Sequence, residues 1–201
     1  FFETMNYCVL CLLLVSMLKS CVLCSLLNPL SHNVKHKKAG KMNCNGAYMC
    51  GLLTLEGGEG HGMYHHPKPS VHGIWPEVPP YGNSPCVKPS GSTAAPTYAA
   101  ACYPNQLNFQ THEWNKHGIC AGVKDCYDFA AQVCNISTVP LKIMKSVGEN
   151  FKKQVSALEA QKYPIVTVDH EEDQIELAVC ASKDGRWQIT HPESFGTICA
   201  P

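Results

Sequence analysis

The cysteines are the most informative feature of this sequence for its fold. There are 13 cysteines in 201 residues, and such a density favours an oxidising compartment, where disulfide bonds form and persist. Four of them lie in an apolar stretch near the N-terminus: Cys8, Cys11, Cys21 and Cys24. The other nine are an odd number, so they cannot all pair within one chain. The length predicts one folded domain.

The apolar stretch predicts a cleaved leader over residues 1–27. Its unbroken part, residues 7–18, has the length of a signal-peptide core. A membrane span over residues 7–27 would place Lys19 well inside the bilayer, at a cost of about 2.5–3.5 kcal/mol near the centre. An uncleaved anchor is the alternative. Met5 could be the true start, because Phe-Phe-Glu-Thr precedes it.

The segment 112–118, His-Glu-Trp-Asn-Lys-His-Gly, is predicted to be helical. At about 100° per residue, four acid–base or charged side chains share one face of such a helix: His112, Glu113, Lys116 and His117. Gly118 is suited to end the helix in the left-handed conformation. A patch of this composition could move protons and stabilise a developing phosphoryl charge. A solvated polar face is the alternative, and a second histidine segment upstream weakens it.

The upstream segment reads Ser70-Val-His-Gly-Ile-Trp-Pro-Glu77. Together, the two segments resemble the two active-site stretches of the T2 ribonucleases. The first family stretch, His-Gly-Leu-Trp-Pro, is matched with Ile74 in place of Leu. The second, Phe-x-x-His-Glu-Trp-x-Lys-His-Gly-x-Cys, is matched by Phe109, residues 112–118 and Cys120. The resemblance covers residues 70–201, which we expect to form one domain with a divergent segment, residues 28–69.

The resemblance implies an endoribonuclease that cleaves single-stranded RNA with low base specificity. His117 would act as the base that takes the 2′-hydroxyl proton, and His72 as the acid that protonates the leaving 5′-oxygen. Lys116 and His112 would hold the phosphate oxygens, and Glu113 would orient His117 or share in proton handling. The product would be a 2′,3′-cyclic phosphate, later hydrolysed to a 3′-phosphate. DNA lacks the 2′-hydroxyl and should be inert.

Three residues are candidates for base contacts. Trp75 could stack on a base, or it could be a core tryptophan beside its strand. Glu77 stands where the family often has an acidic residue that contacts a base, and Phe109 matches a contact to a second base.

Neither a metal nor a cofactor is expected, because two histidines can carry both proton transfers. A zinc protease motif needs histidines four residues apart, whereas His112 and His117 are five apart. His61, His65 and His66 are interpreted as surface histidines or as histidines that contact site residues from outside, because Gly62 and Pro67 oppose a stable helix there.

The expected partner is single-stranded RNA, with neither DNA nor, after leader cleavage, a membrane, and we expect a monomer. Basic and acidic residues number 16 each, so attraction to RNA would come from histidine protonation and be stronger below about pH 6. The run 32–41 could be an RNA-binding arm or a linker. The resemblance implies a secreted protein, or one in an endolysosomal or vacuolar lumen. A catalytically impaired RNA- or protein-binding member of the same fold is the alternative function.

The expected fold class is α+β, with an antiparallel sheet flanked by helices and stapled by disulfides, as in T2 ribonucleases. Strands are expected at residues 70–75, 163–168, 175–181 and 186–189, and helices at 125–134 and 140–160, with a weak point at Gly148. Residues 42–69 are expected to lack the family's first strand and to form loop.

The resemblance also implies two disulfide bonds, Cys86–Cys120 and Cys180–Cys199. A further bond, Cys50–Cys126, is a guess. Asn135 begins an Asn-Ile-Ser glycosylation acceptor.

Overall fold

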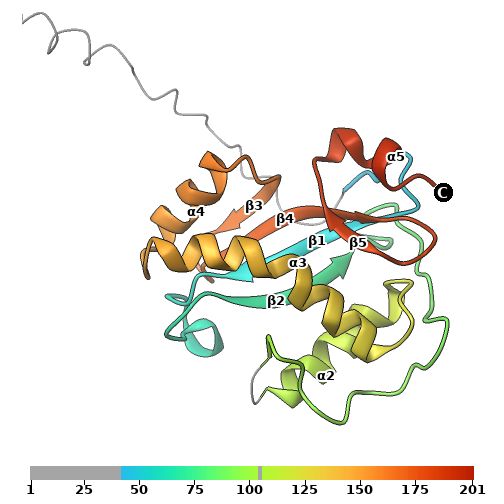
Figure 1. Cartoon of the computed structure of the whole chain (residues 1–201), viewed down its shortest axis with the longest axis horizontal. Helices are drawn as coiled ribbons and strands as arrows, with labels where there is room; N and C mark the ends of the chain where they lie inside the picture. The colour runs from blue at the N-terminus through green and yellow to red at the C-terminus, as the bar shows by residue number, and fades with distance from the viewer. Residues whose placement is uncertain (1–41, 104–105) are drawn as a thin grey trace, which may run out of the picture. The chain divides into compact units, whose positions relative to one another are not determined.

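The computed structural model describes residues 42–103 and 106–201 (Figure 1). The expected leader, the start at Met5 and the basic run 32–41 lie outside the described residues. The strands are β1 (Met49–Glu56), β2 (Ser70–Pro76), β3 (Ile165–Asp169), β4 (Gln174–Ala181) and β5 (Trp187–Ile189). The helices are α2 (Leu107–Lys116), α3 (Cys126–Ser146), α4 (Phe151–Ala160) and α5 (Phe195–Ile198), with 3-10 turns η2 (Gly62–Tyr64), η3 (Gly118–Cys120) and η4 (Pro192–Ser194).

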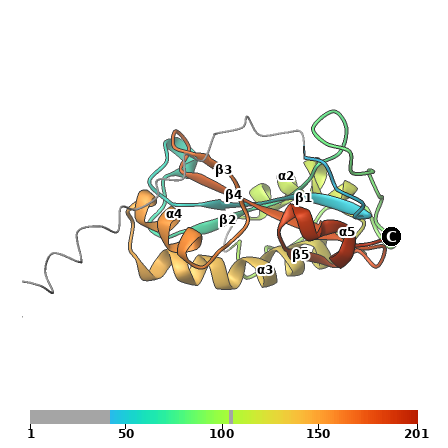
Figure 2. The same cartoon turned by 90° about the horizontal axis from the view of Figure 1, so that it is seen from above.

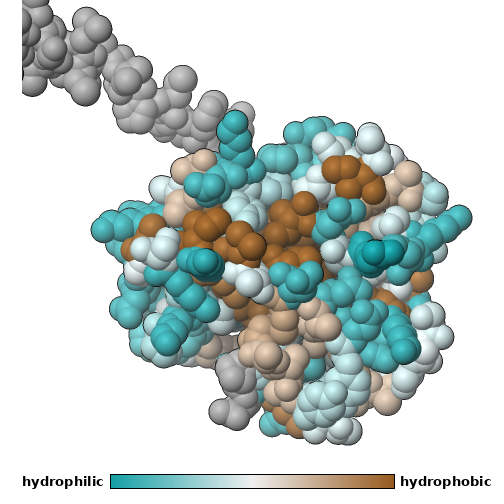
Figure 3. Space-filling model, viewed as in Figure 1, coloured by the Kyte–Doolittle hydropathy of each residue, from teal (hydrophilic) through white to brown (hydrophobic). Residues whose placement is uncertain are grey.

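The five strands form one antiparallel sheet in the order β2-β1-β4-β3, with β5 also paired to β4. Helix α3 packs across β1, β2 and β5, and Figure 2 shows α3 and α4 along the same side of the sheet. The expected α+β class with an antiparallel sheet and flanking helices is therefore confirmed. Seen from the side of α3, apolar side chains gather in a band where this helix crosses the sheet (Figure 3).

Strand β1 overturns the prediction that residues 42–69 lack a strand. All eight of its residues are buried, and it pairs with β2 on one side and β4 on the other. A strand covered on both faces need not alternate between apolar and polar residues, and this absence of alternation explains the error. The glycine-rich run begins only after Glu56. Gly51 lies within the strand, where a Cβ would overlap the carbonyl oxygen of Trp75 on β2.

The long helix α3 overturns the predicted break between residues 134 and 140. It begins at an Asp125 cap, whose side chain accepts from two main-chain N–H groups, and it continues through Pro140. The chain breaks later, around Gly148 (φ +80°), which agrees with the weak point expected there. Asn150 then caps α4 by accepting from the N–H of Lys153.

Four disulfide bonds hold the loops to this frame: Cys44–Cys50, Cys86–Cys120, Cys102–Cys134 and Cys180–Cys199. The two bonds implied by the resemblance are confirmed, and the guessed Cys50–Cys126 bond is wrong. Cys126 is buried and forms no disulfide with any described cysteine. Among residues 42–103 and 106–201, no helix is long and apolar enough to cross a bilayer.

Candidate functional site

One cavity of about 860 Å³ lies between the sheet and α2. Its walls include all eight residues predicted to act in catalysis or base contact: His72, Trp75, Glu77, Phe109, His112, Glu113, Lys116 and His117. Side chains of the η2 turn and of strand β4 complete the walls. The structure therefore brings together two segments that are about 40 residues apart in the sequence.

A bulge in β2 directs His72 into this cavity. Thr54 on β1 lies opposite Gly73, but the next β1 residue, Leu55, lies opposite Val71. His72 is the extra residue between these pairs. Simple alternation would place it on the same face as Ile74, in the core, whereas a bulge re-aims the side chain. His72 thus lies on the face of the sheet that carries Glu56.

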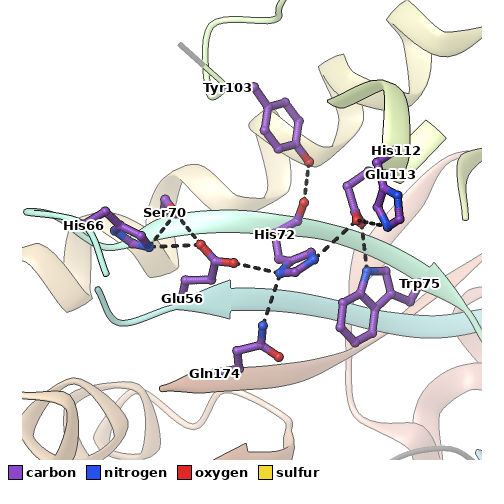
Figure 4. Close-up of polar contacts among 9 residues, drawn as sticks. All are labelled: Glu56, His66, Ser70, His72, Trp75, Tyr103, His112, Glu113 and Gln174. Atoms are coloured by element: carbon purple, nitrogen blue, oxygen red, sulfur yellow. Dashed lines mark hydrogen bonds and ion pairs between the residues drawn. The ribbon is translucent and has the colours of Figure 1, made fainter. Parts of the chain in front are cut away.

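His72 is buried between two carboxylates (Figure 4). Its Nδ1 donates to Oε1 of Glu56 at 2.7 Å, and its Nε2 lies 3.3 Å from Oε1 of Glu113. Burial alone would lower the pKa of His72, but the carboxylates of Glu113 and Glu56 outweigh it and raise that pKa to about 9. His72 is therefore a cation at neutral pH.

Glu113 is buried on α2 and faces the β2 strand. Its Oε2 accepts from the indole Nε1 of Trp75 at 3.0 Å. Its Oε1 forms the ion pair with His72 but makes no well-formed hydrogen bond. Burial would raise its pKa, yet the pairing with His72 lowers it. Gly73 gives this carboxylate room, because a Cβ there would lie 2.5 Å from Oε2.

His117 lies just beyond the helix rather than on it. Helix α2 ends at Lys116, and His117 (φ −122°, ψ −50°) is its C-cap. The prediction that Gly118 ends the helix in a left-handed conformation is wrong. Gly118 instead starts η3 and packs so closely against Trp114 that a Cβ would lie 2.5 Å from its ring.

The environment of His117 keeps its ring neutral. The imidazole stacks on Trp75, with ring centroids 5.1 Å apart. Burial and the nearby cations Lys116 and His72 together lower the pKa of His117 to about 4, although the charge of Glu113 acts in the opposite direction. Glu113 thus contacts His72 and Trp75 directly but influences His117 through its charge. His72 and His117 therefore carry different charges between about pH 4 and pH 9.

Lys116 and His112 are exposed at the cavity rim. His112 Nε2 lies 4.0 Å from Oε1 of Glu113. Both side chains lie on the same helix face, as predicted. Lys116 places its ammonium group at this rim, beside the imidazole of His112.

The three candidate base-contacting residues lie in different surroundings. One face of the Trp75 ring is covered by His117, and its Nε1 is bonded to Glu113. Phe109 meets His72 edge-on, with ring centroids 4.9 Å apart. Glu77 is buried, and burial together with the charge of Glu176 raises its pKa to about 7.

Sequence reasoning missed Glu56, and it left open whether His66 is a surface residue or one that contacts a site residue from outside, as it does through Glu56. Glu56 ends β1, the strand that was not predicted. The available signal was a carboxylate directly after an apolar run, Leu52-Leu-Thr-Leu55. Gln174, at the start of β4, was also missed, and its Nε2 lies 3.2 Å from Nδ1 of His72.

Asn135, the expected glycosylation site, is exposed on α3. Ser137, the third residue of the same Asn-Ile-Ser motif, is buried.

Within the described part of the chain, no group of three or more His, Cys, Asp and Glu side chains is arranged to hold a metal ion. No family model matches the chain, and no curated protein or solved structure matches it.

Proposed function

We propose that this chain is a T2-type endoribonuclease that cleaves single-stranded RNA without a metal ion and with low base specificity. The observation that carries the proposal is the charge difference between two imidazoles in one cavity. His72 is held as a cation between carboxylates, and His117 is held neutral by burial. An acid and a base are thus present together at the same pH, as the reaction requires.

In the first step, neutral His117 takes the proton of the ribose 2′-hydroxyl. The 2′-oxygen attacks phosphorus, and the bond from phosphorus to the 5′-oxygen breaks. His72 gives its proton to that leaving oxygen. Lys116 and His112 stabilise the additional negative charge on the phosphoryl oxygens. The product is a 2′,3′-cyclic phosphate.

In the second step, the cyclic phosphate is opened by water and the two histidines exchange roles. His72, now neutral, takes a proton from water, and His117 returns its proton to the 2′-oxygen. A 3′-phosphate remains and both imidazoles regain their starting charge. The buried carboxylate of Glu113 stabilises each imidazole while it is charged.

The experiment is incubation of the purified protein with a single-stranded oligoribonucleotide in excess chelator. Mass spectrometry should find 2′,3′-cyclic phosphate ends first and 3′-phosphate ends later, and the matching oligodeoxyribonucleotide should stay intact. His117→Gln is the control for a contaminating nuclease. RNA binding without cleavage would refute the proposal and favour the impaired binding protein. The four disulfides suit a secreted or lumenal protein, and we propose that it acts there as a monomer.

A further inference from the structure

A row of four side chains with alternating charge runs from the surface into the cavity: His66, Glu56, His72 and Glu113 (Figure 4). His66 Nε2 lies 3.0 Å from Oε2 of Glu56, whose Oε1 lies 2.7 Å from His72 Nδ1. Nε2 of His72 then lies 3.3 Å from Glu113. The mechanism above uses the inner two residues and leaves Glu56 and His66 without a role.

In each of the two imidazoles of the row, each of the two ring nitrogens faces an acceptor. His66 Nδ1 lies 2.6 Å from the carbonyl oxygen of Lys68, while its Nε2 faces Glu56. A neutral imidazole carries only one N–H, so only the cation satisfies both contacts. The hydrogen bond with Glu56 accordingly raises the pKa of His66 despite its partial burial. His72 has the same arrangement between Glu56 and Glu113.

Glu56 is held in its charged form by these neighbours. It is buried, and burial alone would raise its pKa. Hydrogen bonds from His66 and His72 outweigh that effect and lower the pKa of Glu56 to about 2. Ser70 Oγ also donates to Oε2 at 3.0 Å. Glu56 is therefore an anion above about pH 2, and its two carboxylate oxygens are directed at the rings of His66 and His72.

We propose that Glu56 is a positioning residue for His72, which fixes the orientation and positive charge of that ring, and that His66 holds Glu56 from the surface side. Because Nδ1 is bonded to Glu56, the N–H on Nε2 is the one that points into the cavity. It contacts Glu113 without a well-formed hydrogen bond, so its proton is available to an acceptor.

Other groups also face His72. The titratable ones are Glu113 on α2, Tyr64 on η2, Tyr103 before α2 and His117 after it. Tyr64 stacks on the ring at a centroid distance of 6.0 Å, and Tyr103 donates to the main-chain oxygen. Gln174 approaches Nδ1 from β4, and a turn of its amide would present oxygen to that N–H. Glu56 is the charged partner of Nδ1 among these contacts.

The first measurement is an NMR titration of the histidine rings, with ¹³C-labelled histidine and no substrate. Glu56→Gln keeps an oxygen that can accept from Nδ1 but removes the charge. It should lower the pKa of His72 by about 1–3, the usual effect of an opposite charge at this range. Glu171→Gln, on the exposed turn before β4, removes an equal charge elsewhere and should leave His72 unchanged.

His66→Gln provides a second variant, at a partly exposed position where folding is at less risk. It keeps a donor for Glu56 but removes a positive charge that competes with His72. The pKa of His72 should therefore rise, opposite to the effect of Glu56→Gln. A lower or unchanged His72 pKa in His66→Gln would overturn the role of His66 in the row.

The kinetic consequence rests on the proposed ribonuclease function. With a dinucleotide substrate, Glu56→Gln should move the alkaline limb of the kcat/KM profile to lower pH. Above about pH 9, kcat/KM should therefore fall 10- to 10³-fold, and the fall should lie in kcat rather than in KM. At pH 5 the two proteins should differ by less than about threefold, because His72 is charged in both.

The two proposals fail separately. An unmoved His72 titration and an unmoved alkaline limb in Glu56→Gln would overturn the positioning role while RNA cleavage stands. Absence of cleavage by the unaltered protein would refute the ribonuclease proposal, and the titration would still decide the role of Glu56.

Discussion

Replacement of His72 or His117 by alanine should reduce RNA cleavage by about 10²–10⁴-fold in each case, the usual contribution of a general acid or base. The two variants should differ on a substrate whose leaving group needs no proton. A uridine 3′-phosphodiester of nitrophenol releases a stable anion, so the acid has little to contribute. His72→Ala should recover most of its activity on this substrate, and His117→Ala should not.

The pKa values of the two rings give the size of the preference for His72 as the acid and His117 as the base. With His72 at a pKa of about 9 and His117 at about 4, almost every molecule at neutral pH carries a charged His72 and a neutral His117. The reversed roles would need the opposite charges on both rings. That form has a population of about 10⁻⁵, a difference of about 7 kcal/mol. The kcat/KM profile should be flat between limbs near pH 4 and pH 9, and its shape is the same for either assignment.

The assay is the release of nitrophenolate, followed by absorbance. Removal of His72 leaves the buried carboxylate of Glu113 without its cation, and Glu56 with His66 alone, and should cost about 3–5 kcal/mol of stability. Thermal unfolding of each variant is therefore measured beside the kinetics, and His72→Gln serves as a milder change. Recovery by His117→Ala instead would reverse the assignment. Equal losses on both substrates would mean that the histidines act mainly in phosphate binding.

Four further predictions can be tested with the same protein. Cleavage should persist in excess chelator, and loss that zinc or magnesium restores would contradict the mechanism. Peptide mapping of active protein should find Cys86 and Cys120 bonded, and a bond of this separation should contribute about 4 kcal/mol on the chain-entropy model. Gly73→Ala should displace the Glu113 carboxylate and lower kcat by about 10²-fold; an unchanged kcat would show that the site can adjust. The free energy of unfolding should decline from about pH 6.5 to pH 9, because unfolded His72 loses its proton near pH 6.5 while native His72 keeps it up to about pH 9. This decline should be much smaller in His72→Gln, where the raised pKa of His66 remains.

The sequence predicted the elements whose residue patterns are local. The strand with His72, the helix face of residues 112–116 and the glycine at residue 148 could all be recognised from short segments. Strand β1 could not, because a strand buried on both faces lacks alternation and resembles any apolar run. The bulge at His72 depends on the register with β1, so it could not be predicted once that strand was missed.

The charges of the site residues could not be predicted from the sequence either. Glu56 is about 16 residues before His72 and becomes its partner only through the pairing of two strands. The depressed pKa of His117 comes from burial against Trp75, which no spacing encodes. Residue types at the right intervals predicted which groups meet, whereas the charge of each group depends on the complete fold.

The Cys86–Cys120 disulfide bond has a consequence for proteolysis. Cys86–Cys120 and Cys102–Cys134 interleave along the chain, and the segment between Cys86 and Cys102 includes exposed residues 91–95. A protease cut within 91–95 would separate the strand that carries His72 from the helix that carries Glu113, but Cys86–Cys120 would still join the two fragments. The nicked molecule would run as one band without reductant and as two bands with it, and both halves of the cavity would stay covalently linked.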